Sequence, residues 1–309
     1  MAILTPVSSQ PPAPRPSAAD AVRAALADGA KRLQRNEGGV RAGDVEAVHQ
    51  MRVAVRRLRS DLRTLKPLLR SDWADELSDA LRPLADSLGA VRDLDVLVER
   101  MEVEGADLAS DLAPLIRDLR DLRDIARMAL IDSLGSRAHA ALVARVATAA
   151  REPQLTPLAA FPASDALPAL VTAAWRRLAR RADPVARALA RDVAGPADAE
   201  LHRVRILAKR ARYAAEAAGR FLGPGRGRAA TRFARRLADV QQLLGEHQDV
   251  TGVIRELRDA VGVHGDAGLS FAAGRLLERE VAAAAYARAA FPGLWAELRR
   301  PRLRTWLDR

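Results

Sequence analysis

A line of basic side chains within residues 49–69 is the part of the sequence best suited to bind an anion. Read as a helix at about 100° per residue, this segment places Met51 and its leucines on one face and its basic residues on the neighbouring face. The basic stripe consists of His49, Arg52, Arg56, Arg59 and Arg63. An ordinary helix surface would carry acids at i,i+4 positions, but the one interrupting acid, Asp61, lies off the stripe. We therefore expect the leucine face to pack and the basic stripe either to meet an anion or to remain solvated.

The same spacing recurs about half a chain later. Four residues repeat the order of the first four stripe residues, and Arg210 repeats Arg57. The repeated four are His202, Arg205, Lys209 and Arg212. A second pattern, L-G-x-x-[R/Q]-D, occurs at residues 88–93 and again at 244–249. Two matches in the same order in each half predict a duplicated helical unit.

Composition limits the class of protein. The chain has 309 residues, of which 49% are hydrophobic but only 4% aromatic, and no convincing alternating strand occurs. The expected fold is therefore all-α, with two antiparallel helical bundles related by an internal pseudo-two-fold repeat.

A formal charge of +11 favours an anionic partner. The absence of cysteine excludes disulfides and thiolate sites. No apolar run reaches the ~20 residues of a membrane span, and no signal peptide is evident, so we expect a soluble cytoplasmic protein with no membrane partner.

The expected organisation is a proline-rich disordered tail over residues 1–16 and one domain over 17–309. Within that domain we expect a first helical half over 17–152, a linker over 153–168 that is rich in proline, and a second helical half over 169–309.

Turn and cap residues set the expected helix boundaries. A first helix is expected over 17–36, then a glycine-rich loop over 37–43, and then the first basic helix from its N-cap Asp44 to about residue 70. Helices are expected to end near Gly89 and Gly245, with Asp93 and Asp249 capping the next ones. A short helix is expected from residue 184, and residues 291–309 are expected to form a basic tail.

At this point the residues resemble a known family. The paired histidine–arginine helices, the R-R-x-R and K-R-x-R-Y-x-x-E elements and the two L-G-x-x-[R/Q]-D patterns resemble the CHAD family, the conserved histidine α-helical domain, over about residues 18–290. The resemblance implies two bundles related by a pseudo-two-fold axis, binding of inorganic polyphosphate, and often recruitment to polyphosphate granules. Some relatives carry a fused triphosphate-tunnel domain. This sequence lacks that domain's E-x-E-x-K signature, so its hydrolase chemistry is not transferred. One departure is Val91–Arg92, where the second copy has His247–Gln248.

Polyphosphate would suit a line of arginines, because each guanidinium can grip two oxygens at once. The predicted contact surface comprises Arg52, Arg56, Arg57, Arg59, Arg63, Arg205, Lys209, Arg210 and Arg212, flanked by Arg232, Arg235 and Arg236. His49 and His202 open the two stripes, either as groups that titrate near pH ~6.5 beside the phosphates or as structural hydrogen-bonding residues.

Other functions remain open on the sequence. The five histidines show no metal-ligand spacing, and the acids near the arginines are interpreted as helix caps, so we expect no metal, no cofactor, no catalytic residue and no enzyme activity. A histidine phosphotransfer protein and a nucleic-acid-binding protein are the alternatives. Because the stripe lacks aromatic residues for base stacking, nucleic acid is expected only as a non-specific competitor.

Overall fold

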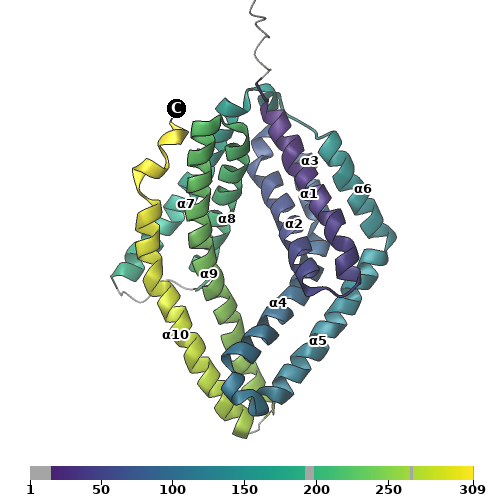
Figure 1. Ribbon diagram of the computed structural model, residues 1–309, viewed down its shortest axis with the longest axis vertical. Coiled ribbons are helices and arrows are strands. Elements are labelled where there is room, and N and C mark those ends of the chain that lie inside the picture. Colours follow the sequence, from purple (N-terminus) through teal and green to yellow (C-terminus); the bar gives the residue numbers. More distant parts are fainter. Residues whose placement is uncertain (1–14, 192–197, 265–266, 309) are drawn as a thin grey trace, which may run out of the picture.

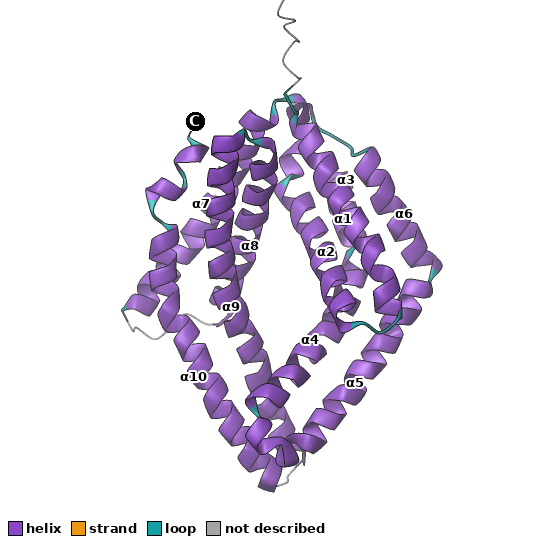
Figure 2. Ribbon diagram, viewed as in Figure 1, coloured by secondary structure: helices purple, strands orange, loops and turns teal. Residues whose placement is uncertain are grey.

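The computed structural model describes residues 15–191, 198–264 and 267–308, and within these ranges the protein is built from helices without any strand. This confirms the predicted all-α class (Figure 2). The first half contains α1 (Ala18–Arg41), α2 (Val45–Thr64), α3 (Ser71–Ala80), α4 (Arg82–Glu104), α5 (Ala109–Gly135) and α6 (Arg137–Arg151). The second half contains α7 (Ala163–Ala190), α8 (Asp198–Phe221), α9 (Pro224–His264) and α10 (Ala267–Leu298). Short 3-10 turns are η1 (Lys66–Leu68), η2 (Ala106–Leu108), η3 (Pro157–Ala160), η4 (Pro301–Leu303) and η5 (Thr305–Leu307).

The helices form two groups that meet at two places. In Figure 1, α1, α2, α3 and α6 stand on one side, and α7, α8 and the first part of α9 stand on the other. The groups touch where α2 packs on α8 and α1 on α7, and again at the far end, where α4 and α5 meet α9 and α10. Helices α2 and α8 therefore face each other near the centre of the molecule.

Two hydrophobic cores hold this arrangement. The larger one joins α1 and α2 to α7, α8 and the first part of α9, and includes Met51, Leu58 and Phe233. The smaller one joins α4 and α5 to α9 and α10 through residues such as Met101 and Leu276. Since each core draws residues from both halves, the halves support each other. None of the helices in the described ranges is both long and apolar enough to span a bilayer.

The start of α2 is fixed by a turn and a cap. Gly43 adopts φ 80°, a left-handed conformation that suits glycine. Asp44 then caps the helix, its carboxylate accepting from the backbone nitrogen of Glu46 at 2.8 Å. This cap was predicted, but the preceding loop was predicted too long, because α1 continues to Arg41. A Cβ on Gly39 would lie 2.6 Å from Ala47, so this glycine serves close helix packing instead of a loop.

The expected breaks at Gly89 and Gly245 are wrong. Helices α4 and α9 run through both glycines, so Asp93 and Asp249 are not N-caps. A glycine inside a helix costs only about 1 kcal/mol relative to alanine. Buried apolar residues on either side stabilise the helix: Leu88 and Val91 around Gly89, and Leu244 and Val250 around Gly245. Conversely, α2 ends at Thr64 and not near residue 70, since the chain tightens into η1 at Pro67, which lacks an amide hydrogen.

Two expectations for the second half are also wrong. No separate helix starts at Pro184, because α7 continues through it; Pro184 is exposed, while Val185 next to it is buried in the core. Residues 291–309 are not a basic tail, because Phe291 and Trp295 lie in α10 and Trp306 lies in η5, all buried. Helix α7 starts within the segment expected to be the linker, and residues 1–14 of the expected tail lie outside the described residues.

Candidate anion-binding site

The packing of α2 on α8 brings basic residues of the two stripes together. We call Arg52 and Arg56 of α2, with Arg205, Lys209 and Arg212 of α8, the central cluster. It borders a cavity of about 480 Å³ between α2, α4, α8 and α9. Lining residues of this central cavity include Arg52, Arg56, His202, Arg205, Asp93, Gln248, Asp249 and Arg255. Side chains that are about 150 residues apart in the sequence thus share one cavity.

The pKa of Lys209 reflects the positive charge of the central cluster. Its pKa is lowered to about 6, first by burial and then by repulsion from Arg56, Arg205, Arg52 and Arg212. The pKa values of Arg56 and Arg205 are also lowered, in both cases chiefly by burial and in part by neighbouring cations. The cluster therefore holds positive charge in partly desolvated surroundings, where an incoming anion would relieve the repulsion.

Acids offset part of this charge at the edge of the cavity. Arg52 Nη1 donates to Asp93 Oδ1 at 2.7 Å and to the carbonyl oxygen of Gly89 at 3.3 Å.

In the second half, the guanidinium of Arg205 lies over Gly245, with its Nη2 atom 3.3 Å from where a Cβ would stand. Corresponding arginines thus rest on corresponding glycines, which agrees with the predicted repeat; the repeat itself stays a prediction.

Several hydrogen-bonding groups of the cluster are unused. The Nε atom of Arg205 is buried and makes no hydrogen bond, and the same is true of Arg59 Nε. The Nε atom of Arg212 also makes no hydrogen bond, although it lies 3.5 Å from Glu216 Oε1 in an ion pair. A buried donor without an acceptor costs free energy. An anion in or beside the central cavity would supply acceptors as well as charge.

The two histidines differ in their surroundings. His202 Nδ1 is 2.7 Å from Gln248 Oε1, so the ring nitrogen donates to the amide oxygen. His49 has Arg92 nearby instead, and its pKa is lowered by burial first and by this arginine second. The difference follows from the departure between the two repeats at these two positions. Both histidines border the basic surface, but only His202 lines the central cavity.

Arg57 is already paired. Its Nη1 atom lies 2.8 Å from Glu216 Oε2, and its Nε atom lies 3.8 Å from the buried Asp61. Arg57 and Arg212 both stack on the ring of Tyr213, with 5.0 and 4.7 Å from the guanidinium carbon to the ring centroid. Arg57 therefore connects α2 to α8, and the anion contact expected of it stays a prediction.

The remaining predicted residues lie away from the central cavity. Arg59 lies near Arg63 and Arg82, and its pKa is lowered by burial and by these two cations. Arg63 and Arg210 line a separate cavity between α2, α7 and α8. Arg232, Arg235 and Arg236 are exposed on α9. Arg236 pairs with Asp239 at 3.2 Å. It precedes Gly245 by nine residues, about two and a half turns, so it points from the opposite side of α9.

Sequence reasoning missed Arg255 and Arg177. Arg255 lines the central cavity. It follows Gln248 by seven residues, which is about two turns, so the spacing could have identified it. Arg177 lines the cavity that contains Arg63 and Arg210; it belongs to α7, outside either motif, and no signal in the sequence marks it. Among the described residues, no group of three or more His, Asp or Glu side chains is arranged to hold a metal ion.

Comparisons with known proteins identify the family of this chain. A family model described as the CHAD domain matches residues 24–258. Two uncharacterized proteins of Mycobacterium tuberculosis strains are each 31% identical over 279 residues, 87% of this chain and 51% of theirs. The chain thus spans about half the length of the curated relatives it matches.

Solved structures share the fold. PptA from Streptomyces chartreusis is 27% identical, with a TM-score of 0.74 covering 91% of this chain and 99% of that one. The CHAD domain from the plant Ricinus communis is 29% identical, with a TM-score of 0.69 covering 94% of this chain and 97% of that one. Because the family model matches most of the sequence and a solved CHAD domain has the same architecture, this chain belongs to the CHAD domain family.

Proposed function

We propose that the chain binds inorganic polyphosphate through the central cluster. The observation that carries this proposal is the convergence of four arginines and Lys209 from α2 and α8, where burial and the charges of the arginines lower the pKa of Lys209 to about 6. Guanidinium groups match the oxygens of phosphates, and the buried Nε atom of Arg205, which makes no hydrogen bond, is a donor that a phosphate oxygen can satisfy.

A linear polyanion fits better than a single phosphate. Beyond the central cluster, the stripe on α2 continues through Arg59 to Arg63, and at ~1.5 Å per residue Arg63 lies about 16 Å along the helix from Arg52. On α8, Arg210 lies next to Arg63. One phosphate would meet part of this line, whereas a chain of phosphates can follow it.

The proposed activity is binding without turnover. Phosphoryl transfer would need carboxylates free to hold Mg²⁺. Three acids line the central cavity, Asp93, Asp249 and Glu256. Two of them interact with its arginines: Asp93 pairs with Arg52 at 2.7 Å, and the charge of Arg205 is the largest influence that lowers the pKa of Asp249 against the still larger effect of burial. Their charges stabilise the arginines in this arrangement. We further propose that the protein resides in the cytoplasm on polyphosphate granules, which a fluorescent fusion would test by co-localisation.

The test is a titration with long-chain polyphosphate at two salt concentrations, with duplex DNA and transfer RNA as competitors. Tight, salt-sensitive binding that nucleic acid displaces poorly is expected. Arg56→Glu combined with Lys209→Glu should abolish binding, because it places two acids inside the central cluster. The matched control is Arg137→Glu with Arg151→Glu, which makes the same charge change on exposed positions of α6.

Three results would contradict the proposal. Equal loss in the central and control variants would mean that net charge alone governs binding. Stronger binding to nucleic acid than to polyphosphate would favour the nucleic-acid alternative. Transfer of a radiolabelled phosphoryl group to His49 or His202 from a response-regulator partner would favour the phosphotransfer alternative.

A further inference from the structure

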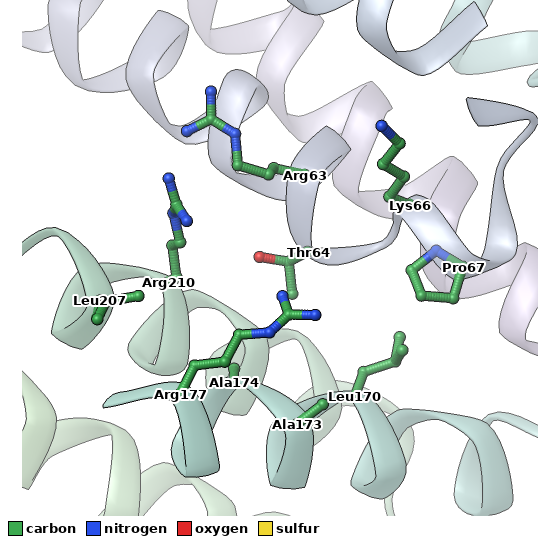
Figure 3. Close-up of a pocket in the computed structure, with 10 residues that line it drawn as sticks. All are labelled: Arg63, Thr64, Lys66, Pro67, Leu170, Ala173, Ala174, Arg177, Leu207 and Arg210. Atoms are coloured by element: carbon green, nitrogen blue, oxygen red, sulfur yellow. The ribbon is translucent and has the colours of Figure 1, made fainter. Parts of the chain in front are cut away.

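A second basic cavity lies on the side of α2 and α8 that faces α7. It has a volume of about 360 Å³, and four cations from four elements line it: Arg63 from α2, Lys66 from η1, Arg177 from α7 and Arg210 from α8. Figure 3 shows Arg177 and Arg210 rising from one wall towards Arg63 and Lys66 on the other. We call this space the side cavity.

The positive charge of the side cavity is not balanced by any acid in its lining. Lys66 is paired outside it, with its Nζ atom 2.6 Å from Asp75 Oδ2. Burial and then repulsion from Arg63 and Arg177 lower the pKa of Arg210. Within the described part of the chain, Arg63, Arg177 and Arg210 form no ion pair. Three guanidinium groups thus converge on one space.

The floor of the side cavity is apolar. Leu170, Ala173, Ala174 and Leu207 line it beneath the cations. Polyphosphate has no group to place against such a surface. The composition of the wall therefore indicates a ligand that carries an apolar part together with its negative charge.

An apolar groove continues from this floor. It has a volume of about 430 Å³ and shares Pro67 and Leu170 with the side cavity. Its other lining residues are Leu68, Leu158, Phe161, Asp165, Ala166 and Ala169. Leu158 and Phe161 are 52% and 56% exposed. Asp165, the acid among them, accepts a hydrogen bond from the Ser164 hydroxyl at 2.9 Å.

Backbone hydrogen bonds hold Phe161, whose ring is exposed, in place. The carbonyl oxygen of Phe161 accepts from Ala18 N at 2.8 Å, and its amide donates to Leu158 O at 3.3 Å. An isolated bridge between Ser17 and Pro162 holds the same segment against the start of α1. The groove is therefore preformed, which lowers the entropic cost of placing a flexible chain in it.

We propose that the side cavity and the groove form one binding site for an amphiphilic anion, namely a phosphate monoester that carries a single aliphatic chain. Arg63, Arg177 and Arg210 would grip the phosphate, and the chain would cross Pro67 and Leu170 to lie on Phe161. The site is centred outside the central cavity, since Arg177, Leu170 and Phe161 do not line that cavity. It shares Arg63 and Arg210 with the line of cations proposed for polyphosphate. The proposal therefore stands whether or not the central cluster binds polyphosphate.

The test compares inorganic phosphate, butyl phosphate and dodecyl phosphate, the last kept below its micellar concentration, by calorimetric titration of the full chain. Each methylene that the groove buries should strengthen binding by about threefold to fourfold, so dodecyl phosphate should bind at least tenfold more tightly than butyl phosphate. Arg177→Glu should weaken binding of both esters at least tenfold. Phe161→Ser should shrink the difference between the two esters and leave butyl phosphate unchanged.

The matched control is Arg176→Glu, an exposed neighbour on α7 that does not line the side cavity; it should bind like the unmodified chain. Equal affinity for butyl and dodecyl phosphate, or equal loss in Arg176→Glu and Arg177→Glu, would overturn the proposal. Binding to vesicles that contain phosphatidic acid, without binding to the monomeric ester, would overturn it in favour of a membrane surface.

One further comparison separates this site from the proposed function. Arg56→Glu with Lys209→Glu should lose polyphosphate and retain dodecyl phosphate, whereas Arg177→Glu should show the reverse. If Arg177→Glu weakens polyphosphate as strongly as the central double variant does, the side cavity belongs to the polyphosphate surface and the amphiphile site is overturned. If the unmodified chain binds dodecyl phosphate but no polyphosphate, the proposed function alone fails.

Discussion

Lys209 couples anion binding to protonation. Its pKa of about 6 means that most of this side chain is neutral above neutrality in the free protein. A bound polyanion favours the charged form and raises that pKa, so the complex holds more protons than the free protein between the two pKa values. Binding at about pH 7.5 should therefore take up a proton, and affinity should fall as pH rises, by up to about tenfold per pH unit.

Calorimetry in two buffers of different ionisation enthalpy measures this uptake directly. Lys209→Arg is the matched variant, because arginine keeps its charge at this pH. It should bind without proton uptake and with a flatter pH profile. Equal uptake in both proteins would assign the proton to a group other than Lys209 and would show that Lys209 is already charged.

The protonation of Asp61 makes the stability of the fold depend on pH. It is 5% exposed, and burial raises its pKa to about 7 in spite of the opposing charge of Arg57. Because the folded-state pKa lies above the unfolded value of about 3.9, the folded state binds more protons between these pH values. The stabilising contribution of the protonated carboxyl is thus present at low pH and is lost as pH rises to about 7.

Asp61→Asn should remove this dependence. The free energy of unfolding, measured with urea at about pH 5 and pH 8, should fall less with rising pH in the variant than in the unmodified chain. An identical fall in both proteins would mean that Asp61 stays ionised when buried, held by Arg57.

At the scale of elements, the sequence predicts the helices that carry the cluster but not where every helix ends. The 3-4 spacing of Leu58 and its neighbours identifies α2 because the buried face has the helical period, and Asp44 marks its start. Gly89 and Gly245 gave wrong helix ends, because a glycine is also compatible with a helix interior that packing stabilises. The convergence of Arg56 and Lys209 could be expected only through the resemblance, since contact between distant helices depends on tertiary packing.

The two glycines also allow a matched experiment. A Cβ on Gly89 would meet nothing within 4 Å, whereas one on Gly245 would press on the Arg205 guanidinium at 3.3 Å. Gly89→Ala should therefore raise the free energy of unfolding by about 0.4–1 kcal/mol, as expected for an unhindered helical position. Gly245→Ala should gain less and should weaken polyphosphate binding, since Arg205 must shift. Equal gains, with binding intact in both variants, would show that Arg205 does not depend on this glycine.

At the scale of the whole molecule, net charge and local arrangement make different predictions. The formal charge of +11 attracts any polyanion, but counterion release depends on the cations that actually contact the phosphates. For a flexible single strand, each contact contributes about 0.7 to the slope of log affinity against log salt. Arg56→Gln with Arg205→Gln should thus reduce the slope by about 1.4, because both residues lie in the central cluster.

Arg137→Gln with Arg151→Gln changes the net charge equally, on α6. If the central cluster is the contact surface, this control lowers affinity slightly and leaves the slope unchanged, since its arginines release no counterions on binding. An equal change of slope in the two double variants would mean that phosphates spread over the whole basic surface. The salt dependence therefore distinguishes a site built by the packing of α2 on α8 from a charge that merely follows from composition.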